Sequence, residues 1–111
     1  MDIFKVYTGE SAPTIVEERI NRKTMRYIPY EISKDETGMY SWRYVPVAPN
    51  KFNYGGVIET IVYLKYDYNA VMAILSNYLL DPDDENVKEE FLEFQNWRKY
   101  AKGIAREIFQ K

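Results

Sequence analysis

The stretch GMYSWRYVPV, residues 38–47, alternates aromatic side chains with other side chains. Alternate residues of a β-strand point to the same face of a sheet, so Tyr40, Trp42 and Tyr44 are predicted to form one row. Such a row either fills a hydrophobic core or forms a platform on which single-stranded nucleic acid stacks. A core is favoured, because Arg43 falls on the opposite face and because a strongly apolar helix later in the chain needs a sheet face to cover it.

The same stretch is one arm of a predicted β-hairpin. The β-rich stretch TMRYIPYEIS, residues 24–33, supplies the other arm. The connecting loop KDETG ends in Gly38, which suits the left-handed position of a short hairpin loop. Pro29 and Pro46 have no N–H to donate to a neighbouring strand, so we expect them at sheet edges or bulges.

The N-terminal segment has a less regular pattern. Residues 3–7 alternate in the way typical of a short strand, and residues 9–13 break that pattern. In the segment TIVEERINRK, residues 14–23, apolar residues share a helical face, and Thr14 with Glu17 has the spacing of a capping box. This pattern slightly favours a short helix, with a strand as the alternative.

From residue 54 onward the hydrophobic spacing is that of helices. We predict helices over residues 54–66, 68–80 and about 82–109, with Asp67 capping the second. The second, YNAVMAILSNYLL, is apolar nearly all round, and a helix of that kind belongs at the centre of a fold. The third would be roughly 40 Å long, against roughly 25 to 30 Å for a compact domain of this size, so its end either projects or is covered by another chain.

These elements together predict an α+β fold in a single domain of residues 1–111. A small antiparallel β-sheet in residues 1–50, with the short helix, is expected to pack on three helices in residues 54–110, the last one long. The chain has 111 residues and is 46% hydrophobic, which is enough to bury a core without disulfides.

The composition narrows the functional classes. The chain contains neither histidine nor cysteine, so Ser-His-Asp and Cys-His catalysis, thiolate metal sites and disulfides are all excluded. The acidic run DPDDEN, residues 81–86, has Asn86 where a calcium-binding loop needs glycine, so it is better interpreted as an acidic helix start. We therefore expect no enzyme activity, no catalytic residues, no cofactor and no metal site.

The charge balance points away from polyanions and membranes. Seventeen acidic and fifteen basic residues give a net charge of −2, so no global field attracts nucleic acid. No segment approaches the roughly 18 apolar residues of a membrane span, and the N-terminus lacks the pattern of a signal peptide. Residues 68–80 lack the basic side chains of a DNA-recognition helix. We expect protein partners, in a reducing compartment or in a virus particle assembled there.

The last predicted helix has a charge pattern that suits self-association. Its acidic residues precede its basic residues, and these are Asp81, Asp83, Asp84, Glu85, Glu89, Glu90 and Glu93, then Arg98, Lys99, Lys102, Arg106 and Lys111. The helix dipole favours this order, and so does an antiparallel pair of copies. We predict a homo-oligomer in which the partner-binding residues are Trp97, Arg98, Ala101, Lys102, Ile104 and Ile108. For Arg98, which falls within the apolar arc, a side chain that extends to solvent is the alternative.

A nucleic-acid-binding regulator is the alternative function. It would use the row of Tyr40, Trp42 and Tyr44, or the basic end of the last predicted helix, to contact bases and phosphates.

Residues 54–107 carry motifs that indicate a family resemblance. A Y-G-G-hydrophobic entry covers Tyr54–Ile58, a helix pair with N-Y-L covers Lys65–Leu79, and a W-R-x-x-A-K-x-I-A motif covers Trp97–Ala105. With these motifs the segment resembles small proteins encoded among the tail and baseplate genes of phages and prophages. The resemblance covers about half of the chain, and it implies a structural or assembly role without chemistry, in the cytoplasm or in a phage particle.

Overall fold

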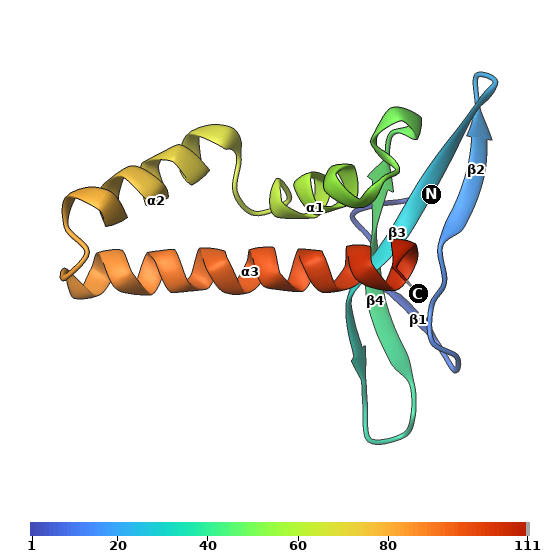
Figure 1. The fold of residues 1–111 in the computed structure, drawn as a ribbon. Coiled ribbons are helices and arrows are strands. Elements are labelled where there is room, and N and C mark those ends of the chain that lie inside the picture. Colours follow the sequence, from blue (N-terminus) through green and yellow to red (C-terminus); the bar gives the residue numbers. More distant parts are fainter. Residues whose placement is uncertain (111) are drawn as a thin grey trace. The chain divides into compact units, whose positions relative to one another are not determined.

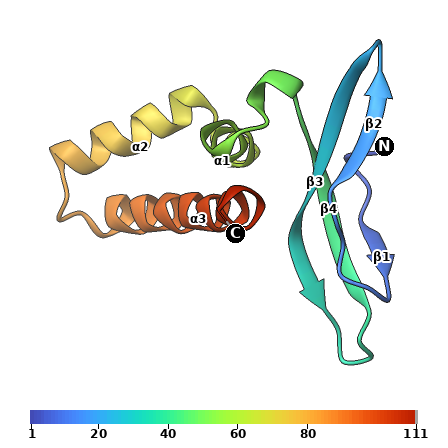
Figure 2. The same ribbon diagram turned by 45° about the vertical axis from the view of Figure 1, so that its right-hand side comes forward.

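The structure is a computed structural model that describes residues 1–110. The described chain has four β-strands, a short 3-10 helix and three α-helices, and it divides into two compact units, residues 1–52 and the residues from 53 onward. The first unit holds the strands and the second holds the α-helices (Figures 1 and 2). The predicted α+β class, with an antiparallel sheet in the N-terminal half and a long last helix, is confirmed. That the two units form one domain stays a prediction.

The first unit is an antiparallel sheet with the strand order β1-β4-β3-β2. Its strands are β1 (Tyr7–Gly9), β2 (Val16–Ile20), β3 (Lys23–Lys34) and β4 (Tyr40–Val47), followed by the 3-10 helix Pro49–Lys51. The long strands β3 and β4 lie side by side (Figure 1) and pair from Arg26 opposite Val47 to Lys34 opposite Tyr40. They form the predicted hairpin.

The loop of this hairpin is organised by Asp35. One oxygen of its carboxylate, Oδ1, accepts hydrogen bonds from the Thr37 hydroxyl at 2.7 Å and from the backbone N–H groups of Thr37 and Met39, each at 2.9 Å. These bonds favour the charged carboxylate, the Thr37 hydroxyl contributing most, and they hold the pKa of Asp35 below its ordinary value. Gly38 has a φ of 87°, which is the left-handed conformation predicted for it.

Pro29 and Pro46 occupy local edges of the sheet although they lie on the two inner strands. The outer strands are short: β2 pairs with β3 only as far as Tyr27, and β1 pairs with β4 only as far as Trp42. Each proline therefore lies beyond the end of the outer strand, where the inner strand has one open flank among the described strands. This position agrees with the N–H that proline lacks.

The predicted helix at residues 14–23 was wrong. Val16–Ile20 is strand β2, which pairs with the start of β3 through a two-residue turn. The turn residues Asn21 and Arg22 have φ angles of 50° and 64°, as in the tight turns that suit the twist of β-hairpins. The helical signal of the segment was weak, and pairing with the neighbouring strand outweighed it.

The first strand begins later than predicted. It covers Tyr7–Gly9 rather than residues 3–7, so Gly9, expected in the break after the strand, is its last residue. The reason for glycine here is a close approach, because a Cβ atom on Gly9 would come within 3.1 Å of Cη2 of Trp42. The strand can therefore lie directly against the indole ring.

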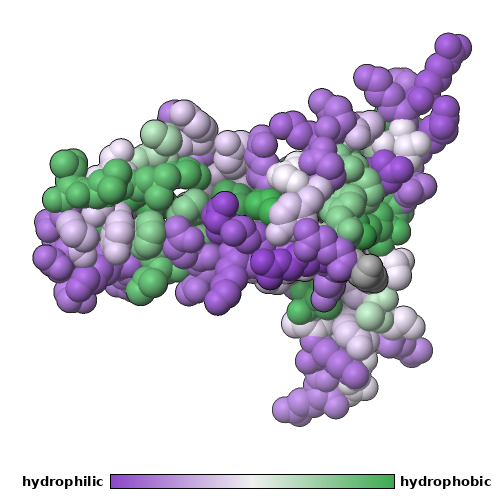
Figure 3. Space-filling view, viewed as in Figure 1, coloured by the Kyte–Doolittle hydropathy of each residue, from purple (hydrophilic) through white to green (hydrophobic). Residues whose placement is uncertain are grey.

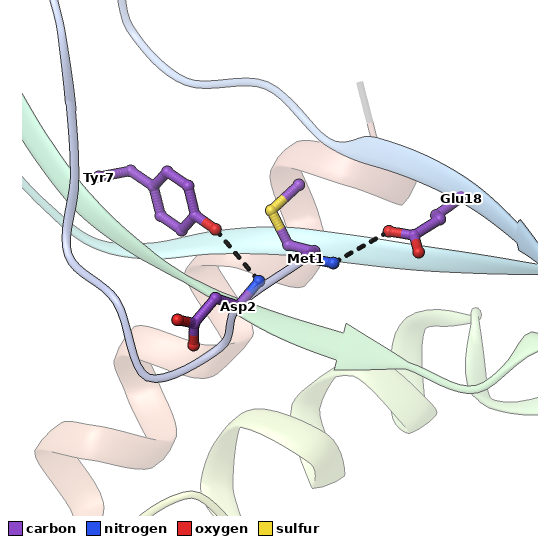
Figure 4. A network of polar contacts seen from close by, with 4 residues as sticks. All are labelled: Met1, Asp2, Tyr7 and Glu18. Carbon is purple, nitrogen blue, oxygen red and sulfur yellow. Dashed lines mark hydrogen bonds and ion pairs between the residues drawn. The ribbon is translucent and has the colours of Figure 1, made fainter.

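The residues before β1 are held by polar contacts, which Figure 4 shows in close-up. The amino nitrogen of Met1 donates to Oε2 of Glu18 at 3.2 Å, and the N–H of Asp2 donates to the Tyr7 hydroxyl at 3.2 Å (Figure 4). The backbone of Phe4 donates to the Asp2 carboxylate at 2.9 Å. These bonds fix the segment next to the aromatic face of the sheet.

The second unit consists of three capped α-helices. They are α1 (Tyr54–Val62), α2 (Tyr68–Leu80) and α3 (Glu85–Phe109). The side chains of Asn53, Asp67 and Asp84 each accept a hydrogen bond from the backbone N–H three residues later, at 2.7, 2.8 and 3.1 Å. The predicted cap at Asp67 is confirmed. The last helix begins at Glu85 rather than at about residue 82, because Asp84 caps it.

The third helix contacts both other helices of this unit. Trp97 Nε1 donates to the backbone carbonyl of Ile61 at 2.9 Å, which joins α3 to α1. Tyr78 of α2 stacks on Phe91 of α3, with ring centroids 3.9 Å apart and planes 9° apart. The helix has 25 residues and is therefore about 37 Å long, close to the predicted length.

The prediction that the second helix lies at the centre of the fold was wrong. Of the described residues of α2, only Ile74 is buried. Leu79 and Leu80 are 82% and 84% exposed, and Met72 is 45% exposed. Figure 3 shows hydrophobic side chains gathered on the surface over α2. One stripe of α2 contacts α3, so the remaining apolar side chains of the helix stay on the surface.

Candidate interaction surfaces

The aromatic row of β4 belongs to the hydrophobic core of the first unit. Trp42 and Tyr44 are 9% and 7% exposed, they cluster with Tyr27, and Tyr40 packs against them half-buried. The rings of Trp42 and Tyr44 meet edge to face, with centroids 6.3 Å apart and planes 89° apart. The core prediction for this row is confirmed, because a stacking platform needs exposed ring faces.

The core was predicted on the ground that the apolar second helix needs a sheet face to cover it. That ground does not hold, because α2 is exposed. The side chains packed around the aromatic cluster come from the sheet unit itself, and they are Ile3, Tyr7, Val16, Met25 and Tyr40. Burial raises the pKa of the Tyr27 hydroxyl, and Glu18 raises it further. Within the described chain, Trp42 Nε1 is buried without a hydrogen-bond partner. An unpaired buried donor of this kind costs about 1 to 3 kcal/mol.

The six residues predicted to bind a partner lie along the second half of α3 and differ in exposure. Arg98 is exposed, Ala101 is buried, and the other four are half-buried, namely Trp97, Lys102, Ile104 and Ile108. The structure brings Arg98 and Lys102 together at a cleft. It places Trp97 in contacts within the helical unit.

The contacts of Trp97 involve both its N–H and its ring. Besides the hydrogen bond to Ile61, the ammonium group of Lys65 lies 4.0 Å from the ring centroid, and the Tyr100 ring stacks at 5.2 Å. A cation over a tryptophan face is attracted by the ring quadrupole. Trp97 therefore anchors α3 on the first helix of the unit.

A cleft of about 360 Å³ lies where the start of α2 meets α1 and α3. Apolar side chains line most of it, namely Ile58, Val62, Val71 and Phe94, together with Tyr54 and Tyr63. Two cationic side chains, Arg98 and Lys102, and one carboxylate, Glu59, also line it. Such a cleft can accept an apolar side chain whose neighbours carry negative charge.

The opposite end of α2 carries the most exposed leucines of the described chain. Leu79 and Leu80 end the helix, and the acidic residues Asp81, Asp83 and Asp84 follow them directly. We call residues 79–84 the tip. Asp81 closes α2 through its N–H, which donates to Asn77 O at 2.9 Å.

The electrostatic field of α3 changes sign along its length. In its first half, burial raises the pKa of the neighbouring Tyr66 hydroxyl, and the carboxylates of Glu93 and Glu90 raise it further. In its second half, Arg98, Lys99 and Lys102 line one shared hollow of about 300 Å³. The tip therefore lies at the negative end of the helix and the cleft at the positive end. Lys111, predicted as part of the basic half, lies outside the described residues.

The sequence did not reveal the cleft or the tip as surfaces. The cleft is lined by residues of three separate helices, so no short stretch of the sequence predicts it. The tip has a sequence signal, two adjacent leucines followed directly by Asp-Pro at a helix end, but this signal fits the apolar pattern of a core helix equally well. The stripe that contacts α3, which contains Ile74 and Tyr78, leaves Leu79 and Leu80 on other faces of a 3.6-residue helix.

Comparison of the chain with protein-family models, curated proteins and solved structures gave no match. Among residues 1–110, no group of three or more acidic side chains is placed to hold a metal ion. No helix in that range is both long enough and apolar enough to cross a membrane. The resemblance to phage tail and baseplate proteins, predicted from the motifs of residues 54–107, stays a prediction.

Proposed function

We propose that this chain is a non-enzymatic assembly protein that binds protein through its helical unit and associates with copies of itself. The observation that carries the proposal is the exposure of α2. This helix of thirteen residues has no charged side chain, and of its described residues only Ile74 is buried. Contiguous apolar surface of this kind marks interaction sites in water-soluble proteins.

We further propose that the chain is a structural or accessory component of a phage tail or baseplate, present in the cytoplasm or in the phage particle. Support comes from the resemblance of residues 54–107, whose motifs cover all three helices. The absence of cysteine is compatible with assembly in a reducing compartment.

Size-exclusion chromatography with light scattering tests the self-association. We expect a dimer or larger species at about 100 μM, since an interface of modest area gives micromolar affinity. A monomer at that concentration would contradict self-association. The double variant Ile104→Glu with Ile108→Glu then reports whether the end of α3 takes part, provided that its circular dichroism matches that of the wild type. If the variant unfolds, these residues belong to the core of the unit.

The alternative function, nucleic-acid binding, retains one supporting observation. The basic half of α3 gathers Arg98, Lys99 and Lys102 around one hollow. Fluorescence anisotropy with labelled single- and double-stranded oligonucleotides at about 50 and 200 mM salt tests it, because phosphate contacts would make affinity fall steeply with salt. We expect no salt-dependent binding, and submicromolar binding at the lower salt would favour the alternative.

A further inference from the structure

The tip and the cleft of the helical unit have complementary chemistry. The tip presents two leucines, 82% and 84% exposed, followed by three aspartates. The cleft presents an apolar floor beside two cationic side chains, Arg98 and Lys102. The cleft can bury the exposed leucines of the tip, and its cationic side chains can pair with the aspartates of the tip.

The positions of the two features along α2 suit a symmetric pair. Val71, in the first turn of the helix, lines the cleft, and Leu79 lies in the last turn, at the tip. Eight residues separate them, which is about 12 Å along the helix and about 80° around its axis, whereas Leu80 lies on the opposite side of the helix from Val71. If two α2 helices pack antiparallel about a twofold axis near Leu75, Leu79 of each copy lies level with Val71 of the other.

We propose that two copies of this chain dimerise through α2, each inserting Leu79 into the cleft of the other, with Leu80 beside it at the rim. Asp81 and Asp83 of the tip then face Arg98 and Lys102 of the second copy. A twofold interface is self-complementary, so each contact occurs twice. This inference rests on the proposed function and adds to it the surface, the orientation and the partner.

The available area is sufficient for a dimer. The exposed fractions of Tyr68, Met72, Leu79 and Leu80 are 63%, 45%, 82% and 84%. Their combined exposed surface is on the order of 600 Å², compared with about 800 Å² per partner in a standard protein interface. The remaining area would come from the walls of the cleft. The charge pairs at its rim supply orientation and specificity more than affinity.

Other occupants fit this surface less well. A helix that lies on a membrane carries lysine and arginine on its polar face, whereas α2 has no charged residue and the adjacent half of α3 is acidic. A different protein would need an apolar cleft with cationic residues beside it. The second copy already carries such a cleft.

The first experiment removes the leucines. The double variant Leu79→Gln with Leu80→Gln alters two exposed side chains, so circular dichroism should match that of the wild type. Its dimer dissociation constant, measured by sedimentation equilibrium on the full chain, should rise at least about 100-fold. The matched control is Leu92→Gln, which changes a leucine that is 59% exposed on α3, and it should leave the constant unchanged.

The outcomes separate the two proposals. If the wild type self-associates and the double leucine variant does so equally well, the tip-in-cleft dimer is overturned while the assembly function stands. If the wild type stays monomeric at about 100 μM, self-association itself fails. A monomer that floats with phosphatidylglycerol vesicles would assign the surface of α2 to lipid and overturn the dimer.

The second experiment tests the predicted pairing of opposite charges. Asp83→Arg places a cation opposite Arg98, and Arg98→Glu places a carboxylate opposite Asp83, so each variant alone should be weakened at least about 10-fold. An equimolar mixture should restore the wild-type constant, because both contacts of the mixed dimer then join opposite charges. A mixture no tighter than its components would overturn the proposed orientation.

Discussion

Trp97 Nε1 donates to the carbonyl oxygen of Ile61 at 2.9 Å and thereby ties the longest helix to the end of α1. The indole N–H and the carbonyl would each need another partner if this bond were lost. We predict that Trp97→Phe lowers the free energy of unfolding by about 0.5 to 1.5 kcal/mol. Trp97→Ala should lower it by about 3 to 5 kcal/mol. Urea denaturation checks both values, with Leu92→Ala, an exposed site, expected within about 0.5 kcal/mol of the wild type.

Trp42 should respond differently from Trp97 to the same substitutions. Its Nε1 is buried and unpaired among the described residues, so Trp42→Phe removes an unsatisfied donor while it keeps a ring in the cluster. We predict a change within about 1 kcal/mol of zero. Trp42→Ala leaves a cavity and should cost about 3 to 5 kcal/mol. If urea denaturation showed that Trp42→Phe costs as much as Trp42→Ala, the indole N–H would have a partner after all.

Each compact unit contains one tryptophan, which makes their cooperativity measurable. In Trp42→Phe the fluorescence reports the helical unit through Trp97, and in Trp97→Phe it reports the sheet unit through Trp42. If the chain is a single domain, fluorescence and far-ultraviolet circular dichroism of each variant give coincident urea transitions. Fluorescence that changes at a different urea concentration from the circular dichroism would show that the units unfold independently.

Arg22 has a φ of 64° in the turn between β2 and β3, a conformation that glycine adopts without steric cost. We predict that Arg22→Gly raises the free energy of unfolding by up to about 1 kcal/mol, since Asn-Gly is the preferred pair for this kind of turn. Arg19→Gly, a change within strand β2, is the control and should be destabilising. A loss of stability in Arg22→Gly would indicate that the arginine side chain contributes more than its backbone costs.

Asp35 should make the hairpin loop sensitive to acid. Because the folded state lowers the pKa of its carboxyl, the unfolded state binds the proton more tightly. The stabilisation is therefore complete above the ordinary pKa and is lost as the pH falls through the folded pKa, below about pH 4. A carboxyl NMR titration should give a pKa below that of an unstructured aspartate. In Asp35→Asn the acid-dependent shift of the Thr37 amide should disappear, and its persistence would assign the shift to another group.

The hairpin of residues 24–47 was predictable because its signals are local. Aromatic residues at alternate positions predict that the side chains of Tyr40, Trp42 and Tyr44 lie on one face of the sheet, and Gly38 marks the turn. The turn at Asn21 and Arg22 contains no glycine, so the sequence does not mark the hairpin that joins β2 to β3. The three helices were recognisable from their spacing and from caps such as Asp67.

The exposure of α2 could not be predicted in the same way. Hydropathy states how apolar a helix is, and it does not state which molecule covers it. The central position that we predicted for Leu79 and Leu80 assumes that a single chain buries all of its own apolar residues. Burial of α2 by a second copy would satisfy the same sequence pattern. Hydropathy alone therefore does not distinguish burial within one chain from burial between two chains.

The prolines at the local sheet edges have a consequence for a chain that meets copies of itself at high concentration. An open flank of a strand is a template on which a strand of another molecule can add, and repeated addition leads to aggregation. At Pro46, which is half-buried, the open flank lacks a donor, so an incoming strand would lose a hydrogen bond there, and Pro29 is itself buried. Addition of a strand at either proline is therefore discouraged.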